Sequence, residues 1–340
     1  ALAASPWGDT NSHSIHEKRM PGEIRGRLAP SPTGRLHLGN AWAFLLAWLS
    51  ARACGGTLVL RLEDIDPERS KDHYAQAIIE DLAWLGLDWD AGVGVCSADE
   101  RGPYRQSERG HVYAAILDRL ARQGLTYPCF CSRRELRLLA AAPHIDDVGA
   151  PYPGTCRHLS AGQREERLAQ GRPACLRLRC PPFPIAFADA VQGPQNFLPE
   201  HYGGDFALRR SDGVIAYQLA VAVDDALMGI TQVVRGRDIL PSTPRQIALL
   251  EILGYPPPQY VHFPLLLDAE GQRLAKRHHS LTLHALRNMG VPPRRLIGFL
   301  GYKAGFQDTV QEVSPAELLP AFDLARLPRH DVRHLTHGGM

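Results

Sequence analysis

The sequence has no apolar run long enough to cross a bilayer. Its most apolar stretch, residues 41–53, is shorter than the ~20 residues that a spanning helix needs. It also lacks an excess of one charge, because 38 basic residues are balanced by 36 acidic ones and the net charge is +2. No global basic field therefore points to a nucleic-acid partner. Residues 1–23 lack the order of a signal peptide, so we expect a disordered leader on a cytoplasmic protein.

The sequence also lacks the cysteine pattern of a disulfide framework. Seven cysteines are an odd number spread over 340 residues. Cys129 and Cys131 form a Cys-x-Cys pair, and Cys156 follows. Three such cysteines suit tetrahedral zinc, which readily takes thiolate and imidazole ligands. We expect the remaining cysteines to be ordinary buried thiols: Cys54, Cys96, Cys175 and Cys180.

The N-terminal third of the chain shows the pattern of a βαβ unit. Residues 24–29 predict a short strand, and residues 39–54 predict a helix that Gly55 and Gly56 close. Apolar residues then alternate along residues 57–63, as in a second strand. A strand, a helix and a strand in this order imply a crossover connection and a parallel sheet.

Further along, the patterns predict two helices, an irregular insertion, a region of strands and a final helical part. In chain order these segments are residues 70–85, 108–123, 129–157, 174–238 and 283–299. The strand region includes the apolar run 214–229, in which we expect Asp224 and Asp225 to be structural, because neighbouring residues of a strand point to opposite faces. The predicted fold is α/β, a Rossmann-type doubly wound parallel sheet with an inserted zinc-binding module and a small C-terminal helical region.

The stretch "RLAPSPTGRLHLG", residues 27–39, joins the first strand to the first helix. In an open α/β sheet, ligands bind outside the carboxyl ends of the strands, where this stretch lies. Its prolines stiffen the loop, its glycines let backbone approach a ligand, and the following helix directs N–H groups at anions. His37 can donate to a phosphate oxygen, and Gly39 lets a flat base lie on the backbone. The stretch therefore predicts a nucleotide site.

Three further motifs accompany this stretch: "LRLEDIDPERS" from Leu60, "VVRGRDIL" from Val233 and "RLAKR" from Arg273. Together they resemble class I aminoacyl-tRNA synthetases of the glutamyl type. Asn40 stands where the first signature of that family, His-x-Gly-His, has its second histidine, and Lys276 remains of the second signature, Lys-Met-Ser-Lys-Ser. The resemblance implies His37 and Lys276 as catalytic residues and His37, Gly39, Asn40 and Lys276 as contacts of ATP with Mg²⁺.

The length of the chain resembles that of a short branch of this family, the glutamyl-queuosine tRNA(Asp) synthetases. That branch activates glutamate and attaches it to the queuosine base in the anticodon of tRNA(Asp). We accordingly expect a catalytic domain at residues 24–282, with the zinc module inserted at about 127–160, and a short helical remnant with a polar tail at 283–340. No anticodon-binding domain is expected. The resemblance implies L-glutamate, ATP and the anticodon stem-loop of tRNA(Asp) as partners, and we expect the protein to be a monomer.

Glutamate needs an arginine for its side-chain carboxylate and a carboxylate for its ammonium group. Arg27 and Arg235 are the arginine candidates, and Glu63 is the candidate for the ammonium group, although it could also pair with Arg61. The resemblance places the glutamate site at Arg27, Ala29, Ser31, Glu63, Tyr217 and Arg235.

The fourth zinc ligand has two candidates. The resemblance to full-length glutamyl synthetases implies the ligand pattern Cys-x-Cys…Cys-x-His, which selects His158. The resemblance to the short branch implies the pattern Cys-x-Cys…Tyr-x-x-x-Cys, which selects Tyr152, and we prefer Tyr152. The predicted metal set is therefore Cys129, Cys131, Tyr152 and Cys156.

Three other functions remain open from the sequence. They are a truncated glutamyl-tRNA synthetase that charges a tRNA 3′ end, a nucleotidyltransferase of the same superfold, and a non-enzymatic module that binds zinc and RNA.

Overall fold

The computed structural model describes residues 23–96, 99–132, 135, 152–198, 204–268, 270–272 and 282–333. At its centre, a sheet of order β1-β2-β3 lies beside one of order β7-β6-β10-β9. The two meet where the Thr231 N–H donates to the Arg25 carbonyl at 2.9 Å. The strands are β1 (Arg25–Leu28), β2 (Thr57–Leu60), β3 (Ala91–Gly92), β6 (Ile185–Asp189), β7 (Gly193–Phe197), β9 (Gln232–Gly236) and β10 (Gln259–Phe263). All neighbours within each sheet are parallel except β6 and β7, which confirms the doubly wound α/β fold.

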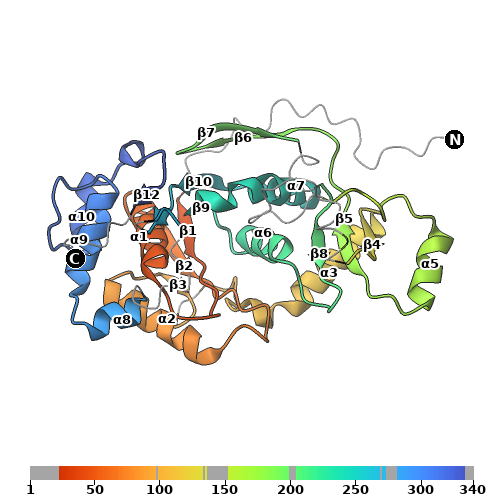
Figure 1. Ribbon diagram of the computed structural model, residues 1–340, viewed down its shortest axis with the longest axis horizontal. Helices are drawn as coiled ribbons and strands as arrows, with labels where there is room; N and C mark the ends of the chain where they lie inside the picture. The colour runs from red at the N-terminus through yellow and green to blue at the C-terminus, as the bar shows by residue number, and fades with distance from the viewer. Residues whose placement is uncertain are drawn as a thin grey trace.

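The predicted βαβ unit is confirmed. Strands β1 and β2 pair in parallel, with Arg25 opposite Thr57, and α1 (Leu38–Arg52) connects them. Most of α1 is buried, including Trp42, because sheet and helices surround it (Figure 1). The helix ends at Arg52, and in the turn that follows Gly55 takes a φ of 65°, a left-handed conformation that favours glycine.

The apolar run 214–229 is a helix, so the prediction of a strand there is wrong. Helix α6 (Tyr217–Leu227) buries every residue from Leu219 to Asp225. A continuous apolar run has neither a period of 2 nor one of 3.6, so periodicity cannot separate a buried strand from a buried helix. Asp224 and Asp225 are structural, as expected, but they diverge by about 100° around a helix axis rather than across a strand.

Helices α2 (Asp72–Leu85) and α3 (Gly110–Arg122) lie close to their predicted positions, and α8 (Leu283–Asn288) and α9 (Pro293–Lys303) lie in the predicted C-terminal helical part. The sequence patterns did not predict α5 (Ala161–Ala169), α7 (Thr243–Leu253) or α10 (Pro315–Leu318). Short 3₁₀ turns accompany them in the described part of the chain, at η2 (Gln106–Glu108), η4 (Arg237–Ser242), η6 (Leu319–Ala321) and η7 (Leu324–Arg326). The segment predicted as one helix over 283–299 is two, because Gly290 has a φ of 77° and Pro292 begins the next helix as its N-cap.

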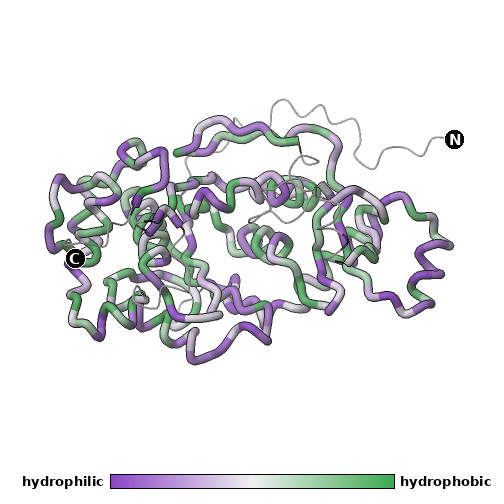
Figure 2. Tube along the Cα trace, in the orientation of Figure 1, coloured by the Kyte–Doolittle hydropathy of each residue, from purple (hydrophilic) through white to green (hydrophobic). Residues whose placement is uncertain are grey.

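A separate antiparallel sheet of order β4-β5-β8 carries the cysteine region. Its strands are β4 (Thr126–Cys129), β5 (Cys175–Leu178) and β8 (Ala207–Arg209), and a further pair joins β11 (Leu266–Leu267) to β12 (Val332–Arg333). The insertion is therefore not irregular from its first residue, because Cys129 ends a strand. Figure 1 shows β4, β5 and α5 at one end of the molecule and α9 and α10 at the other. Helix α5 buries no residue and is largely hydrophilic (Figure 2).

Asp224 ties α6 to the segment that leads into α3. Its fully buried carboxylate accepts hydrogen bonds from Arg109 Nε at 2.6 Å, Tyr113 Oη at 2.7 Å and Gln106 Nε2 at 2.9 Å. A carboxylate in such a place is tolerated because it is paired and its oxygens are hydrogen-bonded.

Replacing Asp224 by alanine should lower the free energy of unfolding by about 3–5 kcal/mol, because it leaves the Arg109 guanidinium buried without its anion. Urea unfolding measures the change. The control is Asp212→Ala, which removes a 49% exposed partner of Arg210 and should change stability by about 0.5 kcal/mol or less. A loss below about 1 kcal/mol in Asp224→Ala would contradict this role.

Candidate active site

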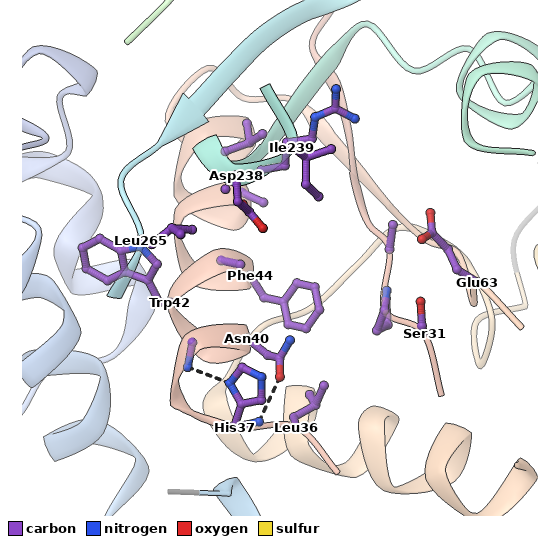
Figure 3. Close-up of a pocket in the computed structure, with 18 of the residues that line it drawn as sticks. Ser31, Leu36, His37, Asn40, Trp42, Phe44, Glu63, Asp238, Ile239 and Leu265 are labelled. Carbon is purple, nitrogen blue, oxygen red and sulfur yellow. Dashed lines mark hydrogen bonds between the residues drawn. The ribbon is translucent and has the colours of Figure 1, made fainter. Parts of the chain in front are cut away.

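A cavity of about 590 Å³ opens at the carboxyl ends of β1 and β9 and the N-terminus of α1. Its volume lies in the range of small-molecule sites. The structure brings together every predicted site residue of the α/β domain that it describes: Arg27, Ala29, Ser31, His37, Gly39, Asn40, Glu63, Tyr217 and Arg235. Lys276 lies outside the described residues. Figure 3 shows Ser31 and Glu63 across the pocket from Phe44 and Asn40 of α1.

His37 is the N-cap of α1 and not part of its first turn. Its ring Nδ1 accepts from the Gly39 N–H at 3.1 Å, and its own backbone N–H donates to Asn40 Oδ1 at 3.0 Å (Figure 3). Because Nδ1 is an acceptor, a neutral His37 ring carries its proton on Nε2. Asn40, which departs from the family signature, thus serves as the capping residue of the third helical position.

Four charged side chains form a buried network beneath the pocket. The Asp225 carboxylate accepts from Arg61 Nη1 at 2.7 Å and Arg27 Nε at 3.3 Å, and Arg61 Nη2 donates to Glu63 at 3.1 Å. Burial alone would raise the pKa of Asp225, but the two arginines outweigh it and lower the pKa. Burial raises the pKa of Glu63, although Arg61 and Arg27 oppose the shift. The network keeps Arg27 and Glu63 in place at the pocket floor.

Arg235 of β9 is held by a second network, made of neutral partners. Its Nε donates to His262 Nε2 at 2.9 Å and its Nη2 to Thr243 Oγ1 at 2.8 Å. Its Nη1 is buried and has no hydrogen-bond partner within the described chain. The His262 Nδ1 donates in turn to Asp189 at 2.6 Å. Burial first, and then Arg235 and Arg27, lower the pKa of His262 to about 4, so the ring is neutral at pH 7.

The cavity has a polar part and an apolar part. Tyr217, the first residue of α6, is 40% exposed at the rim. Phe44, Ile239 and Leu265 line the wall that Figure 3 shows toward α1 and β9. A site with convergent arginines, a carboxylate, a helix N-terminus and an apolar wall can hold a zwitterion beside a flat, phosphate-bearing ring.

Three cysteines gather at the end of β4. The sulfur atoms of Cys129, Cys131 and Cys156 lie within 4.8 Å of one another, and those of Cys131 and Cys156 are 3.7 Å apart. Two Zn–S bonds of ~2.3 Å at a tetrahedral angle place their sulfurs ~3.8 Å apart, so the spacing fits a tetrahedral thiolate site. The Cys175 thiol, first, and the Arg177 guanidinium lower the pKa of Cys129, which favours the thiolate that a metal binds.

Tyr152, and not His158, faces this cluster. Tyr152 is buried, and its hydroxyl accepts from the Cys156 N–H at 2.7 Å and contacts the Cys129 thiol. His158 is exposed. Burial raises the pKa of Tyr152, so its phenol would need a neighbouring cation to ionise. The described residues therefore offer three sulfurs and one phenol oxygen to a metal ion.

The other cysteines only partly match the expectation of buried thiols. Cys180 is buried and Cys175 partly so, but Cys54 and Cys96 are exposed. Cys54 follows the C-cap of α1, and Cys96 lies after β3.

Comparison with known proteins agrees with this geometry. Residues 23–326 match the family model of class I tRNA synthetases (E and Q), catalytic domain. The glutamyl-Q tRNA(Asp) synthetase of Nitratidesulfovibrio vulgaris is 56% identical over 90% of this chain and 94% of its own length. The chain belongs to the glutamyl-Q tRNA(Asp) synthetases.

A second relative and a solved structure are also similar to this chain. The one from Symbiobacterium thermophilum is 53% identical over 91% of this chain and 95% of its own length. A solved glutamate tRNA ligase from Elizabethkingia meningosepticum, in complex with its amino acid, superimposes with a TM-score of 0.76 at 27% identity. The match covers 92% of this chain and 67% of the ligase.

The sequence alone does not reveal the residues that hold the site arginines. Its patterns predict only a structural role for Asp225 and do not single out His262, Asp189 or Thr243. The available signal was a charged or polar residue inside an apolar run, as in "YVHFP", because such a residue is rarely buried without a partner.

None of the described helices is long and apolar enough to span a membrane.

Buried His262 predicts a loss of stability on acidification. Its pKa is about 4 in the folded protein and ~6.5 when unfolded, so between these values the unfolded chain binds the extra proton. This contribution should be complete above pH ~6.5 and should fall by about 3 kcal/mol toward pH ~4. Urea unfolding of the protein and of His262→Gln across this range measures it. Parallel pH curves for the two proteins would contradict the prediction.

Proposed function

We propose that this chain activates L-glutamate with ATP and transfers it to the queuosine base in the anticodon stem-loop of tRNA(Asp). The observation that carries the proposal is one pocket lined by both Glu63 and Arg235, whose buried guanidinium has no carboxylate partner among the described residues. A ligand with an anionic side chain and an ammonium group complements this pair. The names of relatives at 56% and 53% identity support the same amino acid and the same acceptor.

Arg235 and Arg27 would bind the side-chain carboxylate of glutamate. Glu63 would bind the ammonium group, because Arg61 occupies one of its oxygens and leaves the other. Tyr217, at the rim, would close over the bound amino acid.

The loop after β1 would complete the glutamate site through Ala29 and Ser31. At the adjoining end of α1, the N-terminus and the Nε2–H of His37 would bind the phosphates of ATP. Gly39 and Asn40 line the same part of the pocket, and Lys276 would add a positive charge on the phosphates. Mg²⁺ would arrive with ATP and retain several water ligands.

The reaction this site would perform is carboxyl activation. An α-carboxylate oxygen of glutamate attacks the α-phosphorus of ATP, the bond from that phosphorus to the bridging oxygen breaks, and pyrophosphate leaves. The site contributes position and stabilisation of phosphate charge, and His37 and Lys276 would supply the latter. A hydroxyl of queuosine then attacks the carbonyl carbon of the adenylate, AMP leaves, and the hydroxyl proton passes to solvent.

An anticodon loop is a suitable second substrate, because its unpaired bases can be splayed into a pocket. A tRNA substrate would place the enzyme in the cytoplasm. The enzyme would act as a monomer, because one chain carries both the amino-acid site and the nucleotide site. Zinc held by Cys129, Cys131, Cys156 and Tyr152 would be structural, one ion per chain, joining β4 to the segment around Cys156.

The function is tested by incubating the protein with labelled glutamate and ATP and either tRNA(Asp) or tRNA(Glu). We expect glutamate-dependent ATP–pyrophosphate exchange and transfer of label to tRNA(Asp) that contains queuosine. The matched control is tRNA(Asp) without queuosine, which should accept none. Removal of the 3′-terminal nucleotides should leave the label in place. Labelling of tRNA(Glu) at its 3′ end would instead establish an ordinary glutamate–tRNA ligase.

Metal retention tests the proposed zinc ligands. Tyr152→Phe should weaken retention about tenfold or more, since loss of even an outer-shell partner has that effect. The matched control, His158→Ala, should change nothing, because His158 is exposed. Zinc content is measured by mass spectrometry after dialysis against graded chelator. Loss of zinc in His158→Ala and not in Tyr152→Phe would refute the assignment.

A further inference from the structure

The two site arginines are neutralised in different ways. Arg27 lies 3.3 Å from the Asp225 carboxylate and also donates to the Val234 carbonyl at 3.2 Å. Its charge is therefore paired within the protein. Arg235 is equally buried, with 6% of its surface exposed, yet no carboxylate of the described residues lies within 4.0 Å of it.

Both partners of Arg235 are uncharged. Thr243 is fully buried, and its hydroxyl lies 2.8 Å from Nη2 of Arg235 and 3.1 Å from Nε2 of His262. His262 accepts from Nε of Arg235, which requires a ring without a proton on Nε2. A buried guanidinium with neutral partners is left short of an anion, which a bound carboxylate would supply.

Asp189 fixes the tautomer of this histidine. Its carboxylate accepts from the Nδ1–H and the backbone N–H of His262, and from the backbone N–H groups of Val191 at 3.0 Å and Gln192 at 2.8 Å. These bonds anchor Asp189 to the turn after β6. The proton of His262 is thereby held on Nδ1, and Nε2 remains the acceptor for Arg235.

The guanidinium group is planar, so bonds at Nε and Nη2 determine where Nη1 points. Nη1 is buried and has no hydrogen-bond partner among the described residues, and Arg235 lines the pocket. The neutral network thus leaves one nitrogen without a partner and one uncompensated charge beside the pocket.

We propose that Asp189, His262 and Thr243 are positioning residues that hold Arg235 as the determinant of a side-chain carboxylate, and so make the site select glutamate over glutamine. The inference rests on the proposed function and deepens it. Arg27, paired with Asp225, contributes to binding but less to this choice. Glutamine would leave the Arg235 charge without an anion, which is a large penalty in a buried site.

The test is ATP–pyrophosphate exchange by the full chain, with KM measured for glutamate, glutamine and ATP. His262→Leu removes the acceptor of Arg235 Nε, and Thr243→Val removes the acceptor of Arg235 Nη2 with little change of shape. Each should raise the KM for glutamate about tenfold or more, the effect of one lost charge-assisted hydrogen bond, with the KM for ATP within about twofold. As the KM for glutamate rises, the preference for glutamate over glutamine should fall.

His262→Gln is the conservative variant, because its side-chain oxygen can still accept from Arg235, and it should recover most of the preference. His111→Leu, on the exposed face of α3, is the matched control and should resemble the wild type. If His262→Leu does not fold, Thr243→Val decides the question. An unchanged preference for glutamate over glutamine in the variants, or an equal rise in the KM values for glutamate and ATP, would overturn this inference but not the proposed function. A wild type without glutamate-dependent exchange would overturn the proposed function as well.

Discussion

The arrangement of the site depends on the pairing of buried charge around Asp225. This one carboxylate, at the pocket end of the sheet, is shared by Arg27 of β1 and Arg61 beyond β2. Removing it would leave the Arg27 guanidinium buried without its ion-pair partner and Arg61 paired with Glu63 alone, which is a costly change in a core. Its neighbour Asp224 points to another side of α6 and pairs with Arg109. The two adjacent carboxylates therefore fix α6 against the central sheet and against α3 at once.

This constraint explains why the site forms where it does. Parallel strands end at the same edge of the sheet, and the loop after β1 and the N-terminus of α1 meet there. The paired charges keep Arg27 and Glu63 at the floor, while β9 brings Arg235 in from the neighbouring sheet with neutral partners. The site thus has one arginine that pairs with a carboxylate of the protein and one that has no carboxylate partner among the described residues. The proposed recognition of an anionic side chain rests on this difference.

Local features could be predicted from the sequence, and features that depend on tertiary packing could not. The βαβ unit and the loop of residues 27–39 each lie in consecutive residues, so the sequence predicts both the unit and the place of that loop at the pocket. The run that forms α6 was assigned to a strand because a segment buried on all sides loses its periodicity. His262 and Asp189 are 73 residues apart, and nothing near either in sequence reveals the pair. The choice of Tyr152 over His158 came from resemblance, and burial of the phenol supports it.

The central claim is that the Arg235 guanidinium binds the side-chain carboxylate of glutamate. A crystal structure of the full chain with bound glutamate tests it most directly. The account predicts a carboxylate oxygen within hydrogen-bond distance of Nη1, with the bonds from Arg235 to His262 and Thr243 intact. The ammonium group should lie against Glu63. A glutamate bound with its side chain elsewhere, and Nη1 still without a partner, would contradict the account.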